Sequence, residues 1–198
     1  MNKFILSGTV CGNPKFSHET VGEKFYCFDL KSKRKSENTD IIPCVVSEMF
    51  LSKIKENEKV LLKGNVRTRN VYDEDSRHLE ITMFVLEVGE YGDYDINEVE
   101  LEGTICKEPI CRDTPLGRQI ADVLIASNRE RSNKSDYIPC LLWGRNALRV
   151  SKDSVGDKVK VWGRLQSRVY SKKLEDDVTI EKVAYELSVS KYFKDYNN

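Results

Sequence analysis

The two halves of this chain repeat one another with a period of about 95 residues. Glycine, threonine, cysteine and proline recur in the same order in the two halves: Gly8, Thr9, Cys11, Pro14 and Gly22 return as Gly103, Thr104, Cys106, Pro109 and Gly117. A chain of 198 residues has room for two domains of the commonest size, about 100 residues each. A period this long indicates a duplicated domain and not a solenoid of short units.

The match between the halves continues after short insertions. One inserted residue aligns Asp40, Ile42, Pro43 and Cys44 with Asp136, Ile138, Pro139 and Cys140, and a few more align Val60, Gly64 and Arg69 with Val159, Gly163 and Arg168. The stretch GEYGDYDINE at 89–98 separates the copies with two glycines and no proline, as a short linker would. We therefore predict a first domain at 1–91, a linker at 92–97 and a second domain at 98–198.

Each copy has the hydrophobic pattern of five strands and one short helix. In the second copy the strand signals are VELEGTI, QIADVLIAS, DYIPCLLWG, KVKVWGRLQSRVY and VTIEKVAYELSVSKYF. Asn146 is placed to cap a short helix that ends before Gly156. Three strands, a helix and two strands predict an all-β protein with short helices, built as two tandem OB-folds, which are five-stranded Greek-key barrels.

Charge and hydropathy exclude several classes of protein. The 32 basic and 32 acidic residues cancel, which excludes a wholly basic nucleic-acid coat but leaves room for a local basic groove. No apolar run approaches the length of a membrane span, and the start MNKFILSGTV is too short for a signal peptide, so we expect a cytoplasmic protein. Six cysteines without a CxxC pair and only two histidines do not support a metal site, and no cofactor is expected.

Residues 103–128, GTICKEPICRDTPLGRQIADVLIASN, resemble the opening of bacterial single-stranded DNA-binding proteins. The matching features are the leading glycine, the proline, the Arg-x-Thr-Pro-x-Gly turn and a strand that ends near Ala126. The resemblance continues through 136–145 and 156–170 and covers nearly all of the second copy. The first copy is more divergent but keeps Gly8, Pro14, Gly22, Pro43 and the stretch GNVRTR at 64–69.

This resemblance implies a particle of four OB-folds, which a tandem chain would reach as a homodimer. The family commonly ends in a flexible tail with an acidic, Phe-terminated tip that recruits repair enzymes. This chain ends in SKYFKDYNN, which does not match such a tip, so replication proteins are candidate partners but not by that route. This difference is typical of a plasmid, phage or primosome-type accessory protein.

Aromatic side chains are the candidates for stacking on unpaired DNA bases. The resemblance places Tyr137, Trp143 and Tyr170 where the family has its stacking aromatics. In the first copy these positions hold Ile41, Ser47 and Val71, although Tyr72 lies one residue further on and is included as a candidate. An aromatic residue in a strand is more often part of the core, and that interpretation competes with the stacking one.

Basic side chains near these aromatics are the candidates for binding phosphates and bases. In the second copy they are Arg112, Arg129, Arg131, Lys134, Arg145, Arg168, Lys172 and Lys173, and in the first copy Arg34, Arg67 and Arg69. Isolated surface cations are usually only solvated, but these cluster on predicted turns and hairpins. The first copy is predicted either to bind phosphates weakly or to have become a structural partner.

Other functions have less support in the sequence. An enzyme is not expected, because His18 and His78 fall in predicted turns and the chain has no Ser-His-Asp set or phosphate-cradling loop. Trp162 is a candidate for a subunit interface or for cover by its own fold, and it is not counted as a DNA contact. The main alternative to single-stranded DNA binding is a replisome or primosome adaptor, an OB-fold protein with weak or no DNA binding.

Overall fold

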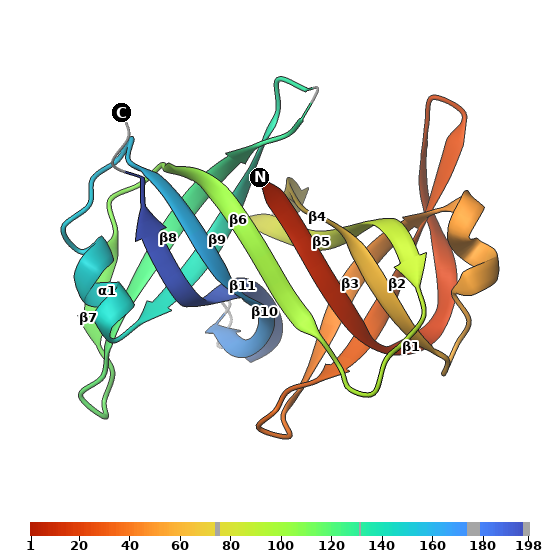
Figure 1. The fold of residues 1–198 in the computed structure, drawn as a ribbon, viewed down its shortest axis with the longest axis horizontal. Helices are drawn as coiled ribbons and strands as arrows, with labels where there is room; N and C mark the ends of the chain where they lie inside the picture. The colour runs from red at the N-terminus through yellow and green to blue at the C-terminus, as the bar shows by residue number, and fades with distance from the viewer. Residues whose placement is uncertain (74–75, 131, 174–178, 196–198) are drawn as a thin grey trace.

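The computed structural model describes residues 1–195 except 74–75, 131 and 174–178. It is built almost entirely of strands (Figure 1). The first half contains β1 (Asn2–Thr20), β2 (Glu23–Lys33), β3 (Thr39–Ser47), the 3-10 helix η1 (Glu48–Lys53), β4 (Lys59–Asp73) and β5 (Ser76–Gly89). The second half contains β6 (Asn97–Ile105), β7 (Ile110–Asp113), β8 (Gln119–Asn128), β9 (Ser135–Trp143), α1 (Arg145–Val150), β10 (Lys158–Lys173) and β11 (Thr179–Lys194).

The first five strands close into a barrel. Strand β1 pairs with both β2 and β4, β2 pairs with β3, and β4 pairs with β5, all antiparallel. A short parallel pairing of β3 with β5 closes the circle. Alternation sends Phe4, Leu6, Ile42 and Leu62 into the interior, where each is at most 2% exposed.

The second half repeats this topology. Strand β6 pairs with β8 and β10, β8 pairs with β9, β10 pairs with β11, and the parallel pairing of β9 with β11 closes the barrel. The prediction of an all-β chain of two tandem OB-folds is therefore confirmed. Strand β5 ends at Gly89 and β6 begins at Asn97, so residues 92–96 of the predicted linker lie in the connection between the barrels and Asn97 is the first residue of β6.

One antiparallel pairing joins the two barrels into a single 11-stranded sheet. The start of β1 pairs with β6, and Phe4 lies opposite Val99. These two residues are equivalent in the repeat, so a pseudo-twofold axis passes between them. The two barrels are consequently related as two identical subunits of a symmetric dimer would be (Figure 1).

Two details of the sequence prediction are wrong. Helix α1 begins at Arg145 after Gly144, whose φ of 53° turns the chain, and its start has no side-chain cap. Asn146 therefore lies inside the helix and donates from Nδ2 to the carbonyl oxygen of Ser190 at 3.1 Å. His18 and His78 lie in strands β1 and β5 and not in turns, because both hairpins extend further than their sequences suggest. No helix in the described part of the chain is long and apolar enough to cross a membrane.

Candidate nucleic-acid interface

The outer face of β9 carries two of the three predicted stacking aromatics of the second barrel. Ile138, Cys140 and Leu142 point into the barrel and are at most 2% exposed, whereas Tyr137 and Trp143 alternate with them and are 44% and 40% exposed. A residue on the outer face with this exposure is not part of the core. The two rings are six positions apart, which in a strand is roughly 20 Å, so one strand of DNA would have to run along β9 to reach both.

Trp143 lies at the end of β9 beside the β7–β8 hairpin. It borders a pocket of about 730 Å³ that is also lined by Asp113, Gly117, Arg118, Gln119 and Gly144. The hairpin is held closed by the backbone N–H of Arg118, which donates to Oγ1 of Thr114 at 3.0 Å. Arg118 was not among the predicted cations, although it directly follows the TPLG turn that the sequence resemblance had singled out.

The third aromatic, Tyr170, lies near the far end of β10 and is half-buried. The guanidinium of Arg168 lies 5.9 Å from the centre of its ring, within the range of a cation–π contact. The predicted cations Lys172 and Lys173 continue this strand, but their side chains lie outside the described residues, as does Arg131. The described contacts of this end of the interface therefore come from the Arg168–Tyr170 pair.

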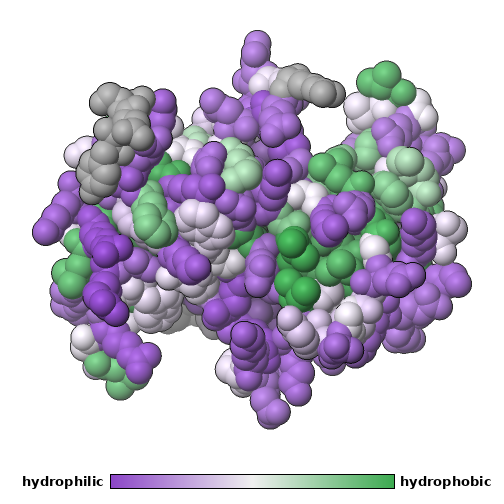
Figure 2. Space-filling model, viewed as in Figure 1, coloured by the Kyte–Doolittle hydropathy of each residue, from purple (hydrophilic) through white to green (hydrophobic). Residues whose placement is uncertain are grey.

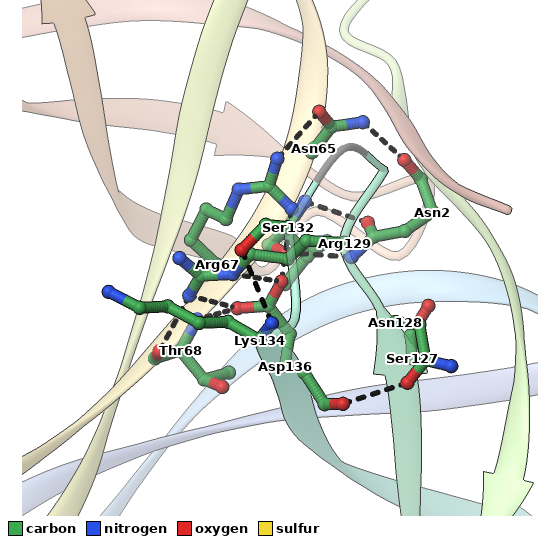
Figure 3. Close-up of polar contacts among 12 residues, drawn as sticks. Asn2, Asn65, Arg67, Thr68, Ser127, Asn128, Arg129, Ser132, Lys134 and Asp136 are labelled. Carbon is green, nitrogen blue, oxygen red and sulfur yellow. Dashed lines mark hydrogen bonds and ion pairs between the residues drawn. The ribbon is translucent and has the colours of Figure 1, made fainter.

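Two of the predicted cations meet at a buried carboxylate between the barrels (Figure 3). Asp136 of the second barrel is fully buried and accepts from Nη1 of Arg67 at 3.0 Å and from Nη2 of Arg129 at 2.7 Å. It also accepts from the backbone N–H of Thr68 at 2.8 Å. Because Arg67 and Thr68 belong to β4, this carboxylate ties the second barrel to the first.

Asp40, the repeat equivalent of Asp136, makes the reciprocal contact. It is fully buried and accepts from Nε and Nη2 of Arg34 at 2.6 and 2.5 Å, and from the backbone N–H of Ser167 in β10 at 3.0 Å. Burial raises the pKa of Asp40, but the hydrogen bonds from Arg34 and Ser167 outweigh it and hold the pKa below its ordinary value. The predicted cations Arg34, Arg67 and Arg129 are thus engaged in the junction between the barrels.

The remaining predicted cations lie on the surface. Arg112 forms an ion pair with Asp122 at 2.9 Å, and Arg69 pairs with Glu80 across β4 and β5. Lys134 and Arg145 are exposed, and within the described part of the chain neither has a carboxylate at ion-pair distance. Among the predicted cations whose side chains the structure describes, these two and Arg168 are therefore the most accessible to a phosphate.

The first barrel places its predicted residues differently. Tyr72 is 71% exposed near the end of β4, and Ile41 is 39% exposed on the outer face of β3. Ser47 is buried, and its hydroxyl oxygen accepts from the backbone N–H of Met49 to cap η1. The sequence prediction missed three other aromatic rings on this barrel, where Phe25 contacts both His18 and Phe84.

Comparison with known proteins identifies the family of the chain. The model of the Single-strand binding protein family matches residues 96–191, which is the second barrel. Single-stranded DNA-binding protein B of Bacillus subtilis is 38% identical over 80 residues, covering 37% of this chain and 71% of that protein. The chain belongs to the single-strand binding protein family. The resemblance predicted from the sequence is confirmed.

For other family members, the match covers a smaller share of the relative's own length. Single-stranded DNA-binding protein A of Bacillus subtilis is 35% identical over 97 residues, covering 46% of this chain and 56% of that protein. The chain spans 48% of the length of a Staphylococcus aureus relative. Nothing in these family matches favours the adaptor alternative.

The fold of the whole chain also has a counterpart among solved structures. The crystal structure of the wild-type single-stranded DNA binding protein from Thermus aquaticus has a TM-score of 0.79 and 17% sequence identity. The match covers 100% of this chain and 94% of the Thermus aquaticus chain. At this identity the likeness concerns the fold alone, and it extends over both barrels.

Proposed function

We propose that this protein binds single-stranded DNA without strong sequence preference, in replication, recombination or repair. The observation that carries the proposal is the pair of half-exposed rings, Tyr137 and Trp143, on the outer face of β9 in a barrel of this family. Each base that stacks on an aromatic ring contributes about 1–3 kcal/mol, and every base has a face that can stack. Such contacts bind unpaired strands of any sequence.

The cations around these rings supply the second requirement. Arg118 borders the Trp143 pocket, Arg168 lies against Tyr170, and Lys134 and Arg145 are exposed near the two ends of β9. Basic side chains of this kind release counterions from the phosphates of a bound strand, which makes binding weaker as salt increases. The site needs no catalytic group, so we propose a binding role and not an enzymatic one.

Fluorescence anisotropy with labelled oligo-dT and a duplex of the same length tests the proposal. We expect single-stranded DNA to bind more tightly, because only unpaired bases can stack, and we expect Trp143→Ala to weaken binding. The matched control is Leu148→Ala, a 50% exposed residue on the neighbouring helix α1. Equal affinity for single and double strands would rule out the proposal.

We also propose that two chains associate, which would bring four barrels together. The face that carries β1 and β6 exposes Ile5, Leu86 and Phe193 at 37%, 54% and 56%, and Phe193 packs edge-to-face on Trp162. A groove of about 790 Å³ on this face is lined by Ile5, Leu86 and Trp162. Figure 2, which views the molecule from this side, shows hydrophobic side chains gathered over the first barrel. Exposed aromatic and aliphatic groups of this kind are typical of protein interfaces.

Light scattering tests the association. We expect a mass of about twice the 22.8 kDa of the chain at micromolar concentration, and a shift toward the monomer for Leu86→Asp. The control is Val155→Asp, which is similarly exposed at 51% but lies in the turn before β10 and not in this groove. A monomeric wild-type protein at this concentration would contradict the proposal.

A further inference from the structure

A groove of about 890 Å³ crosses the outer face of the first barrel. Its lining includes residues from all five strands of this barrel and four residues of the β8–β9 loop of the second barrel. Its aromatic and basic lining residues include Lys15, His18, Arg67, Phe84, Arg129 and Lys134. Neither barrel alone would form this groove.

Three aromatic rings of the first barrel contact one another in sequence beside this groove. His18 lies nearly parallel to Phe25, with ring centres 5.0 Å apart and an interplanar angle of 15°. Phe25 in turn contacts Phe84 at 5.6 Å. Phe25 is only 8% exposed, whereas His18 is exposed and Phe84 half-buried, so Phe25 supports the two rings that line the groove.

The direction of Phe84 shows that it is not a core residue. Its neighbours Met83 and Val85 are 0% and 2% exposed inside the barrel, so alternation along β5 turns Phe84 to the outer face. The guanidinium of Arg67 lies 5.9 Å from the centre of its ring. Arg67 is held in this place by Asp136 and by Oδ1 of Asn65, which limits the conformations it can adopt.

The charges along the groove favour an anionic ligand. Its lining contains five lysine and arginine side chains and three carboxylates, Asp29, Glu80 and Glu130. Glu80 is neutralised by Arg69, and Asp136 lies buried beneath Arg67 and Arg129. Lys15 and Lys134 are exposed, and neither has a carboxylate at ion-pair distance among the described residues. They can therefore contact phosphates, Lys15 from the first barrel and Lys134 from the second.

The groove also connects with the interface of the second barrel. Thr68 lines the groove, and its Oγ1 accepts from the backbone N–H of Tyr137 at 2.9 Å. Tyr137 begins the row of outer-face aromatics that ends at Trp143. A strand that leaves the groove past Thr68 would thus reach the rings of β9 next.

We infer that the first barrel holds its own segment of single-stranded DNA in this groove, with bases on Phe84 and His18 and phosphates on cations from both barrels. This inference rests on the proposed function. The inference differs from the proposed function because its stacking residues, Phe84 and His18, lie outside the positions where the family resemblance placed stacking aromatics. The strand then runs continuously from the first barrel to the second.

Two fluorescence measurements distinguish binding at the second barrel from binding over the whole site. Both tryptophans, Trp143 and Trp162, belong to the second barrel, so quenching of tryptophan fluorescence by oligo-dT reports on that barrel alone. Anisotropy of a labelled oligo-dT long enough to span both barrels reports on the whole site. The variants are Phe84→Leu, which keeps an apolar side chain without a ring, and His18→Ala.

We expect Phe84→Leu to weaken binding of the long oligo-dT by about 5-fold or more and to reduce the number of nucleotides occluded per chain. Tryptophan quenching by a short oligo-dT should stay as in the wild type. The matched control is Phe16→Leu, a 58% exposed ring on the same barrel that does not line the groove. If thermal melts show that Phe84→Leu fails to fold, the exposed His18→Ala decides the question by the same criteria.

A double-mutant cycle tests whether the second barrel completes the groove. Lys134→Ala should weaken binding less in the Phe84→Leu background than in the wild type, because both changes act on one segment of DNA. Lys152→Ala, an exposed lysine after helix α1 and outside the groove, should show no such coupling. Unchanged affinity and occluded length in Phe84→Leu and His18→Ala, with Trp143→Ala still weakened, would overturn this inference alone. Failure of the wild type to prefer single strands would overturn the proposed function as well.

Discussion

The two barrels have the same topology but place their aromatic surface on different strands. At one cross-strand pair of the outer face, the second barrel has Ile120 opposite Trp143, and the first has Phe25 opposite Ser47. Trp143 is open to solvent, whereas Phe25 is covered by His18 from the long β1, and Phe84 supplies a ring from β5 instead. Duplicated barrels can therefore keep an aromatic face while its residues move between strands.

Substitutions at the junction between the barrels should reduce stability more than any other change considered. Asp136→Ala leaves Arg67 and Arg129 without their buried carboxylate, and breaking a buried ion pair in this way costs about 3–5 kcal/mol. The free energy of unfolding measured in urea should fall by this amount. Asp122→Ala, which breaks the exposed pair with Arg112, is the control and should change stability by about 1 kcal/mol or less. Similar losses in the two variants would mean that Asp136 does not hold the barrels together.

A smaller effect is expected from the reciprocal carboxylate, Asp40, as a function of pH. Its lowered pKa means that it stabilises the folded state above the unfolded-state pKa, about 3.9, and that this contribution is lost as pH falls through the folded-state value. The free energy of unfolding should therefore decrease in acid more steeply for the wild type than for Asp40→Asn. Other carboxylates also titrate there, so the difference between the two curves is the measurement. Parallel curves would contradict the prediction.

Substitution of Trp143 should reduce affinity for DNA, whereas substitution of its counterpart Ser47 should reduce stability. Trp143→Ala removes a stacking face and should weaken oligo-dT binding by about 1–3 kcal/mol. Ser47→Ala removes no ring, but it removes the cap of η1, so we expect about 1 kcal/mol of lost stability with little change in affinity. Thermal melts and anisotropy titrations measured together separate these outcomes. Equal weakening of binding in two folded variants would show that the barrels do not differ at this pair.

The smallest expected effect distinguishes an accessible cation from a paired one. Arg168→Ala should lower the slope of log affinity against log salt by about 0.7, the value for one phosphate contact with a single strand. Arg112→Ala should lower it less, because Asp122 already neutralises Arg112 at 2.9 Å. A salt series of oligo-dT titrations gives both slopes. Equal slopes for the two variants would show that the paired Arg112 and the accessible Arg168 contribute alike to phosphate binding.

The fold could be predicted because the residues that repeat are those that the barrel geometry requires. A Cβ atom on Gly64 would collide with the carbonyl oxygen of Phe84, and one on Gly163 with that of Ser188. Strands approach too closely at these points for any side chain, so glycine recurs and the duplication is visible in the sequence. Pro14, which also recurs, falls in the register shift of β1 between Cys11 and Lys15.

The candidate site was harder to predict, because its contacts join residues far apart in the chain. The roles of Arg67 and Arg129 depend on Asp136, and Arg67 and Asp136 belong to different barrels. The groove of the first barrel was missed because Phe84 and His18 lie on β5 and β1, away from the positions that the family resemblance emphasised. Alternation along β5 was the available signal for Phe84, since it lies between two core residues.

The pairing of β1 with β6 also affects how the protein responds to dilution. In two separate single-barrel chains, such an edge-to-edge pairing would dissociate as concentration falls. Here the connection between Gly89 and Asn97 keeps the two edges at a high effective concentration, so their pairing is independent of how much protein is present. Each strand also covers an edge that, in an isolated half, would offer unpaired backbone groups to any other extended chain and so promote aggregation.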